Sequence, residues 1–202
     1  MYLYDNYYTA IEVVKTAWSL FVTRLFYRGA FLIRQPFYLR GRPRVAWGRG
    51  FRTGYRCRLE AFGERNDRET RLSIGESCHM GDNVHIAAAE KVAIGNNCLI
   101  ASHVFISDCS HGDTANQSPS VQPASRPLVT KPTSIGDNVW IGENACILMG
   151  SRVGTGSIVG ANAVVTKAFP DYCILAGAPA KIIKRYNFDT CSWEKIPTDL
   201  LS

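Results

Sequence analysis

The 202-residue sequence has no apolar segment long enough to cross a membrane. A membrane-spanning helix needs about 20 consecutive apolar residues, whereas the most apolar segment, residues 17–26, is short and contains Arg24. The first residues also lack the basic start and the cleavage site of a secretory signal peptide. We therefore expect a cytoplasmic protein without a transmembrane span, and a location at the inner membrane surface is kept as an alternative.

Cysteine spacings that would indicate a disulfide framework or a zinc site are also missing. The seven cysteines are odd in number and include no CxxC pair. Small disulfide-rich domains and zinc sites need such paired spacings, and reduced thiols are typical of the cytoplasm. We expect free cysteines, several of them as small hydrophobic residues in the core, and no metal.

Acidic residues are scarce in one part of the chain. Residues 24–71 contain thirteen arginines but only four acidic residues, and the whole chain has a net charge of +6. Such a patch favours an anionic partner: an acidic glycan, a lipid pyrophosphate or a membrane surface. The alternative is a solvated face of outward side chains. Nucleic acid is not expected, because the patch lacks stacking aromatic residues on a recognised module.

A repeat of six residues dominates the second half of the chain. Neither the 3.6-residue period of a helix nor the two-residue period of a lone strand explains this step. One short strand and one corner per six residues is typical of a β-helix, in which stacked turns bury a shared column of side chains. The sequence therefore predicts an all-β fold, with inward residues at Ile135, Ile141, Ile147, Val153, Val159 and Val165, and a second inward series at Val139, Ala145, Ser151, Ser157 and Ala163.

The same step extends toward the N-terminus and predicts about five turns of three strands. It starts near Val45, contains a polar corner loop at residues 63–70, and slips by two residues between Ile86 and Ile94. Between the third and fourth turns, residues 112–133 contain four prolines, which strands do not tolerate. A loop this long inside a compact domain is usually functional or disordered.

Three regions follow from this pattern. Residues 1–44 are expected to be a helix and capping segment, residues 45–168 the β-helix domain, and residues 169–202 a basic C-terminal extension. Within the first region, residues 7–27 have apolar residues at helical spacing. We interpret this apolar stripe as a cap on the open end of the β-helix; the alternative is docking on a membrane interface beside the arginines. The stripe consists of Ala10, Val13, Val14, Ala17, Trp18, Phe21 and Leu25.

Three motifs carry a family resemblance: VWIGENA at 139–145, GANAVVTKAFP at 160–170 and AGAPAKIIK at 176–184. With these motifs, residues 45–185 resemble the hexapeptide-repeat acyltransferases, which fold as a left-handed parallel β-helix. FISDCSHG at 105–112, followed by SRPL at 125–128, is most similar to the bacterial O-acetyltransferases of surface polysaccharide, such as O-antigen or capsule. The resemblance implies the left-handed winding, acetyl-coenzyme A as cosubstrate, and a homotrimer with active sites between subunits.

Acetyl transfer to a hydroxyl needs a base for the acceptor proton and a donor for the oxyanion. By resemblance, His111 matches the general base of the family. Asp108 orients that imidazole, binds a sugar hydroxyl or has a structural role in a turn. His79 and His85 either line an acceptor groove or are plain surface residues, and Arg126 on the long loop contacts acceptor or cofactor.

The resemblance also implies a track for the coenzyme. Trp140 lines the slot for the pantetheine arm, with a trimer contact as its alternative, and an amide near Gly142 and Glu143 is the candidate oxyanion donor. Thr166 and Lys167 match the adenine and phosphate end. Basic residues of the C-terminal extension would meet the phosphates or form a solvated tail. The full predicted set is Trp140, Gly142, Glu143, Gly160, Ala161, Thr166, Lys167, Lys181, Lys184 and Arg185.

We therefore predict an O-acetyltransferase whose acceptor is a glycan or a lipid-linked glycan. One departure affects the acceptor: residues 87–89 are alanines where the sugar acetyltransferases offer a carboxylate, which argues against a galactoside-like acceptor mode. Three alternatives remain at this stage: an N-acetyltransferase of a nucleotide-linked amino sugar, a zinc lyase like the gamma-class carbonic anhydrases, and a non-catalytic scaffold.

Overall fold

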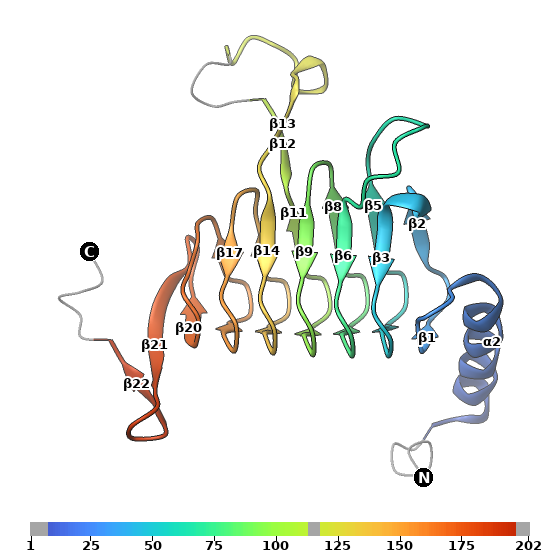
Figure 1. Cartoon of the computed structure of the whole chain (residues 1–202), viewed down its shortest axis with the longest axis horizontal. Coiled ribbons are helices and arrows are strands. Elements are labelled where there is room, and N and C mark those ends of the chain that lie inside the picture. The colour runs from blue at the N-terminus through green and yellow to red at the C-terminus, as the bar shows by residue number, and fades with distance from the viewer. Residues whose placement is uncertain (1–7, 113–117, 197–202) are drawn as a thin grey trace.

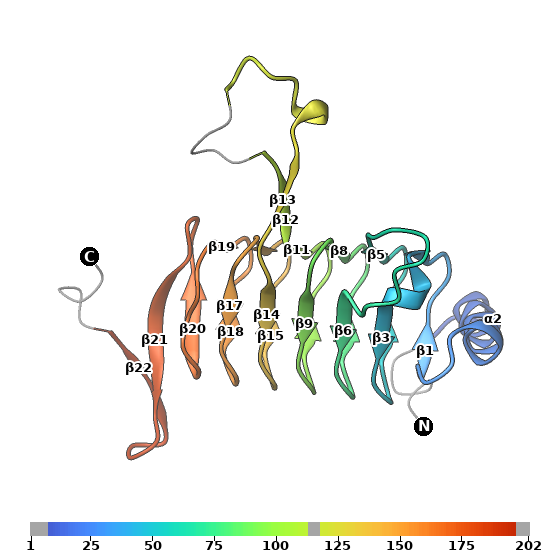
Figure 2. The same cartoon turned by 45° about the horizontal axis from the view of Figure 1, so that its top comes forward.

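Short parallel strands stack into three sheets around one core, which makes a parallel β-helix (Figures 1 and 2). The structure, a computed structural model, describes residues 8–112 and 118–196. A helix lies at one end of the stack, an antiparallel hairpin projects from its side, and a second hairpin extends from the other end (Figure 1). The predicted all-β fold is thus confirmed. Residue 7 of the predicted helix and residues 113–117 of the predicted loop lie outside the described residues.

Apart from the projecting hairpin, successive strands from β1 to β19 enter the three sheets in turn. The first sheet contains β1 (Leu32–Ile33), β4 (Arg52–Thr53), β7 (His79–Met80), β10 (Leu99–Ile100), β15 (Trp140–Ile141), β18 (Ile158–Val159) and β20 (Cys173–Ala176), followed by the antiparallel β21 (Lys181–Asn187) and β22 (Ser192–Lys195). The second contains β2 (Tyr38–Arg40), β5 (Arg58–Ala61), β8 (His85–Ala88), β11 (Phe105–Ser107), β16 (Cys146–Ile147) and β19 (Val164–Val165). The third contains β3 (Val45–Trp47), β6 (Leu72–Ile74), β9 (Val92–Ile94), β14 (Thr133–Ile135) and β17 (Arg152–Val153).

The six-residue step fills the core. All eleven predicted inward positions between 135 and 165 are buried, and like residues stack in register, as in Ile100, Ile141 and Val159 of the first sheet. Cys57, Cys78, Cys98 and Cys173 are buried free thiols, and burial raises the pKa of the Cys57 thiol to about 11. Removing this continuous apolar column from water is the main stabilising contribution to such a fold.

Two kinds of residue make the corners possible. The third residue after each inward aliphatic has a positive φ, at Asn138, Asn144, Gly150, Gly156 and Asn162, and Asn and Gly adopt this left-handed conformation at least cost. A Cβ on Gly142 would lie 2.6 Å from the backbone nitrogen of Ala161 in the next coil. Close stacking of the coils therefore requires Gly142 to be glycine.

The stack is longer than the five turns expected from Val45 onward. β1 and β2 already pair with β4 and β5, and β20 continues the first sheet after Pro170. Ile33 and Leu39 are six residues apart and lie in register with Thr53 and Leu59, but the next residue in this series, Trp47, follows Leu39 after eight residues. This slip of two residues hid the earlier strands. β1 and β2 precede the predicted boundary at residue 44 but pair with strands that follow it, and β20 follows residue 168 but pairs with β18 before it. The division into three regions therefore stays a prediction.

The helix α2 (Ala10–Phe26) forms where it was expected and starts at a capping box between Thr9 and Glu12. It packs against β1, but not through its apolar stripe, so the predicted packing face is wrong. Its buried residues are Thr16, Ser19 and Thr23. The reason is the open edge of the terminal strand, whose backbone groups need hydrogen-bond partners that an apolar face does not offer.

Candidate active site

His111 lies on the hairpin that projects from the β-helix (Figures 1 and 2). β12 (Cys109–His111) pairs with β13 (Leu128–Thr130), and His111 lies opposite Leu128. The hairpin leaves the body at the corner between β11 of the second sheet and β14 of the third. The side chain is exposed, and no described residue hydrogen-bonds its imidazole. The imidazole is therefore available to a ligand or to another chain.

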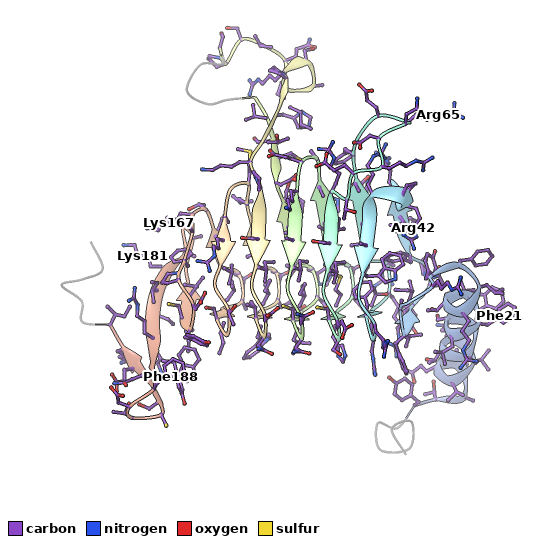
Figure 3. The ribbon with its side chains drawn as sticks, viewed as in Figure 1. Phe21, Arg42, Arg65, Lys167, Lys181 and Phe188 are labelled. Atoms are coloured by element: carbon purple, nitrogen blue, oxygen red, sulfur yellow. The ribbon has the colours of Figure 1, made fainter. Side chains whose placement is uncertain are left out.

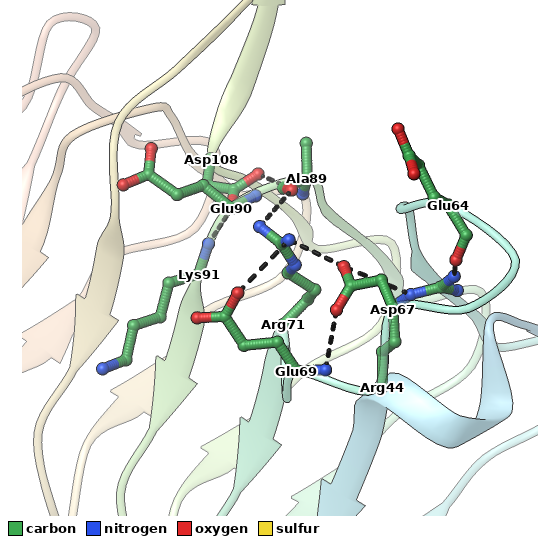
Figure 4. A network of polar contacts seen from close by, with 9 residues as sticks. All are labelled: Arg44, Glu64, Asp67, Glu69, Arg71, Ala89, Glu90, Lys91 and Asp108. Carbon is green, nitrogen blue, oxygen red and sulfur yellow. Dashed lines mark hydrogen bonds and ion pairs between the residues drawn. The ribbon is translucent and has the colours of Figure 1, made fainter.

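Asp108 holds the root of this hairpin. It is completely buried, and its carboxylate accepts hydrogen bonds from the backbone amides of Ala89, Glu90 and Lys91 at 2.7, 2.8 and 2.5 Å (Figure 4). These three residues form the corner at which the repeat slips by two. This geometry agrees with the structural role in a turn that was considered for Asp108. Both carboxylate oxygens accept backbone hydrogen bonds, and the carboxylate does not contact His111.

A chain of polar contacts continues from this corner along the β-helix (Figure 4). Arg71 donates to the carbonyl of Ala89 at 3.3 Å and pairs with Asp67 at 2.7 Å. Arg44 lies 3.7 Å from the same carboxylate and also donates to the carbonyl of Glu64. Hydrogen bonds from the Glu69 amide and from Arg71 lower the pKa of Asp67. Part of the arginine-rich region is thus used to fasten the 63–70 loop.

His85 belongs to a second charged cluster, on the second sheet. Its Nε2 lies 3.0 Å from the buried carboxylate of Glu60, which also pairs with Arg58 at 2.8 Å and Arg40 at 3.3 Å. Burial alone raises the pKa of Glu60, but hydrogen bonds from Arg58 and His85 outweigh it, so the pKa is lowered. The cluster borders an open pocket of about 600 Å³, lined by Phe37, Tyr38, Leu39, Arg40, Arg56, Arg58 and Glu60. Sequence reasoning missed Glu60, although an acid between arginines on a strand was a usable signal.

His79 is exposed on the first sheet, in register between Arg52 and Leu99. Partial burial and the charge of Arg52 lower its pKa. It lies on a different sheet from His85, so one chain does not bring these two predicted acceptor residues together.

Replacing Arg52 with glutamine is expected to raise the pKa of His79, because the repulsion between two cations disappears while partial burial remains. A histidine whose pKa is lowered by folding destabilises the folded state as pH falls below its unfolded value of about 6.5. The variant should therefore lose less stability on acidification. An NMR titration of the His79 ring measures the shift, with Arg56→Gln as the control. An unchanged His79 titration would contradict the assignment.

Five of the predicted coenzyme residues lie together. Trp140 is half exposed on the first sheet, in register with Leu99 and Ile158. Gly142 and Glu143 form the corner that follows, and the backbone of Ala161 stacks against it from the next coil. The amide of Gly142 donates to the carbonyl of Val159. Gly160 is the fifth member of this group. The exposed side chain of Glu143 lies 3.4 Å from His103.

The other predicted site residues lie elsewhere. Thr166 and Lys167 are exposed at the corner that follows β19 of the second sheet. The hairpin leaves the β-helix at the same kind of corner after β11, two coils earlier. β21 places its basic residues at the far end of the first sheet: Lys181, Lys184 and Arg185. The guanidinium of Arg126 donates to the carbonyls of Val121 and Pro119 at 3.0 and 3.4 Å. The side chain of Arg126 therefore hydrogen-bonds within its own loop, and its contact with acceptor or cofactor stays a prediction.

Comparison with known proteins is decisive for the family. A profile described as "Hexapeptide repeat of succinyl-transferase" matches residues 132–167. The chain is 41% identical over 181 residues, 88% of its own length and 90% of the relative's, to the Escherichia coli K12 protein named "Putative lipopolysaccharide biosynthesis O-acetyl transferase WbbJ". The chain belongs to the hexapeptide-repeat acetyltransferases. As a member of this family it is an acyltransferase, as the motifs predicted.

Other hexapeptide-repeat acetyltransferases match over shorter spans or by fold. The Escherichia coli K12 galactoside O-acetyltransferase is 32% identical over 57% of this chain and 55% of its own. A galactoside acetyltransferase solved with coenzyme A superposes with a TM-score of 0.51 at 25% identity, over 76% of this chain and 67% of that one. AntD, an N-acyltransferase from Bacillus cereus, shares the fold, with a TM-score of 0.62 at 17% identity over 81% and 84%.

No group of three or more His, Cys, Asp or Glu side chains within residues 8–112 and 118–196 could hold a metal ion. None of the helices in these ranges is long and apolar enough to cross a membrane. Since the chain is an acetyltransferase, the zinc-lyase alternative has no support.

Proposed function

We propose that this hexapeptide-repeat acetyltransferase transfers acetyl from acetyl-coenzyme A to a sugar hydroxyl of a bacterial surface polysaccharide or its precursor. The full-length similarity to the relative named for lipopolysaccharide O-acetylation supports this acceptor class. The observation that carries the proposal is the placement of His111, an exposed imidazole that no described residue hydrogen-bonds, on a hairpin whose root is held by Asp108. Imidazole is the side chain most often used as a general base in enzymes.

In the proposed reaction, His111 removes the proton of the acceptor hydroxyl as its oxygen attacks the thioester carbonyl. The tetrahedral oxyanion then collapses, the carbon–sulfur bond breaks, and the coenzyme leaves as a thiol after taking up the proton. No acetyl-enzyme is needed. The backbone N–H of Gly142 already donates to the carbonyl of Val159. The backbone N–H of Glu143 is therefore the better candidate for the oxyanion donor.

The proposed site lies between two chains of a homotrimer. His111 projects from one corner, whereas Trp140 and Glu143 occupy the first sheet and the corner after it. Within one chain, the proposed base His111 is therefore separated from Trp140 and Glu143. Leu99 and Trp140 form a neighbouring pair of half-exposed apolar residues on the first sheet, and such a pair is suited to contact with another subunit.

The acceptor is proposed to bind along the second sheet. Arg58, His85 and Phe105 occupy successive outward positions there, and the strand that carries Phe105 leads into the hairpin. The pocket beside Arg58 has three arginines and one buried acid. An acidic sugar or a phosphate-linked sugar would complement this charge.

Purified protein with acetyl-coenzyme A should release free thiol when given sugars with free hydroxyls, and more slowly with amino sugars linked to nucleotides. Mass spectrometry of the product would locate the acetyl group. The surface glycan of cells lacking this protein should contain less O-acetyl than that of cells expressing it. Preferential acetylation of an amine, with unchanged glycan acetylation, would overturn the proposed acceptor.

A further inference from the structure

The helix α2 is attached to the β-helix by its polar side. The hydroxyl of Thr23 accepts the backbone N–H of Ile33 at 2.8 Å and donates to the carbonyl of Ser19 at 2.6 Å. The hydroxyl of Ser19 accepts the backbone N–H of Gln35 at 3.2 Å. Both hydroxyl-bearing residues are buried, so these bonds fix the rotation of the helix about its own axis.

This rotation turns the apolar stripe outward. Five residues at spacings of three and four are each 56–68% exposed: Ile11, Val14, Trp18, Phe21 and Leu25. At about 100° per residue, they lie almost opposite the buried Thr16, Ser19 and Thr23. In the side-chain view, Phe21 points away from the β-helix (Figure 3). Phe26 and Phe31, 69% and 52% exposed, extend the apolar surface beyond the helix.

The helix lies across the end of the stack, so this surface forms an end face of the molecule (Figures 1 and 2). With 17 residues at 1.5 Å each, the helix is about 25 Å long. A large exposed apolar patch on a folded protein marks an interaction site. An exposed apolar face of this length suits a partner that is itself a surface.

Basic residues border the stripe on both sides. By the helical period, Lys15 lies on one flank and Arg24 on the other, and Arg28 follows the helix; all three are exposed. Glu12, the one acidic residue of α2, lies toward the buried side, and its carboxylate is bonded to Thr9 in the capping box. The surface therefore combines apolar side chains with flanking basic residues.

We propose that this end face binds the interface of an anionic lipid bilayer, with α2 lying in the plane of the membrane. Aromatic and aliphatic side chains would enter the boundary between headgroups and acyl chains, while Lys15, Arg24 and Arg28 contact anionic headgroups. A second copy of the chain fits less well, because pairing the stripe with itself would bring the flanking cations together. The proposal goes beyond acetyl transfer and does not depend on it.

Sedimentation of the full chain with vesicles tests the proposal. We expect binding to vesicles of phosphatidylcholine with 30% phosphatidylglycerol, weaker binding to phosphatidylcholine alone, and weakening by salt. The double variant Trp18→Ser, Phe21→Ser should bind at least tenfold more weakly, because two large apolar groups no longer leave water. Lys15→Gln, Arg24→Gln should reduce binding only to the anionic vesicles.

The control is Phe188→Ser, which removes a 62% exposed aromatic residue at the opposite end of the molecule (Figure 3) and should leave vesicle binding unchanged. Circular dichroism and the unfolding midpoint of the stripe variants should match the parent chain, since the replaced side chains are exposed. The proposal is overturned if the parent chain binds neither vesicle type. It is equally overturned if the double variant binds normally, or if that variant changes only the size of the assembly in light scattering.

Discussion

Replacing His111 with alanine is expected to lower the rate of acetyl transfer by about 10²–10⁴-fold while coenzyme A binding persists. This range is the usual contribution of a positioned general base. The loss should fall on kcat rather than on the affinity for the coenzyme, because the predicted coenzyme residues lie on other elements of the chain. Exogenous imidazole should restore part of the activity, since the substitution leaves a space where the ring was.

Transfer is measured by thiol release with a sugar acceptor, and coenzyme A binding by calorimetry. His103→Asn is the matched control: it removes another exposed imidazole from a corner at which φ is +61°, a conformation that asparagine tolerates. This control should keep its turnover. A His111→Ala protein that turns over at nearly the parent rate would remove His111 from the mechanism and leave the family membership untouched.

The repeat was the most predictable part of the molecule. Its inward residues recur every six positions, and like residues of successive coils stack into one column. The sequence alone therefore identified the buried positions from Ile135 to Val165. Family membership then followed from motifs concentrated in the same region. The strands before Val45 were missed because eight residues, not six, separate Leu39 of β2 from Trp47 of β3.

Features that depend on backbone hydrogen bonding were not predictable from apolar patterns. The stripe of α2 has the spacing of a packing face, yet the helix packs through Ser19 and Thr23 because the end strand needs hydrogen-bond partners. Asp108 is close to His111 in sequence, and the sequence alone left open whether it orients the imidazole, binds a sugar hydroxyl or has a structural role in a turn. In the structure its carboxylate accepts hydrogen bonds from backbone amides that lie 17–19 positions earlier in the chain.

Within one chain the predicted site residues lie in separate groups. Trp140, Glu143 and Ala161 are brought together because residues 18 positions apart stack in adjacent coils, which the repeat length itself implies. Whether His111 meets them depends on the packing of one chain against another, and a repeat describes only the stacking within a chain. For this reason one chain brings Trp140, Glu143 and Ala161 together, whereas their role in coenzyme binding and their meeting with His111 stay predictions.

Asp108→Ala should destabilise the protein by about 2–4 kcal/mol. The carboxylate is the shared acceptor of three amides in the corner at residues 89–91, and hydrogen bonds to a buried charged group are each worth more than neutral ones. Part of that corner is open to water, which limits the loss. Urea unfolding should show a lower midpoint with an unchanged slope.

Two further variants separate a structural Asp108 from a catalytic one. Asp171→Asn is the matched control, because its carboxylate also accepts a corner amide, that of Thr155 at 3.0 Å, but is 43% exposed; it should cost under about 1 kcal/mol. Asp108→Asn keeps an acceptor oxygen and should recover part of the stability. Assayed well below its unfolding midpoint, this variant should turn over within about tenfold of the parent, since the hairpin root persists. A fully folded Asp108→Asn protein with a loss as large as that of His111→Ala would instead place the carboxylate in the chemistry.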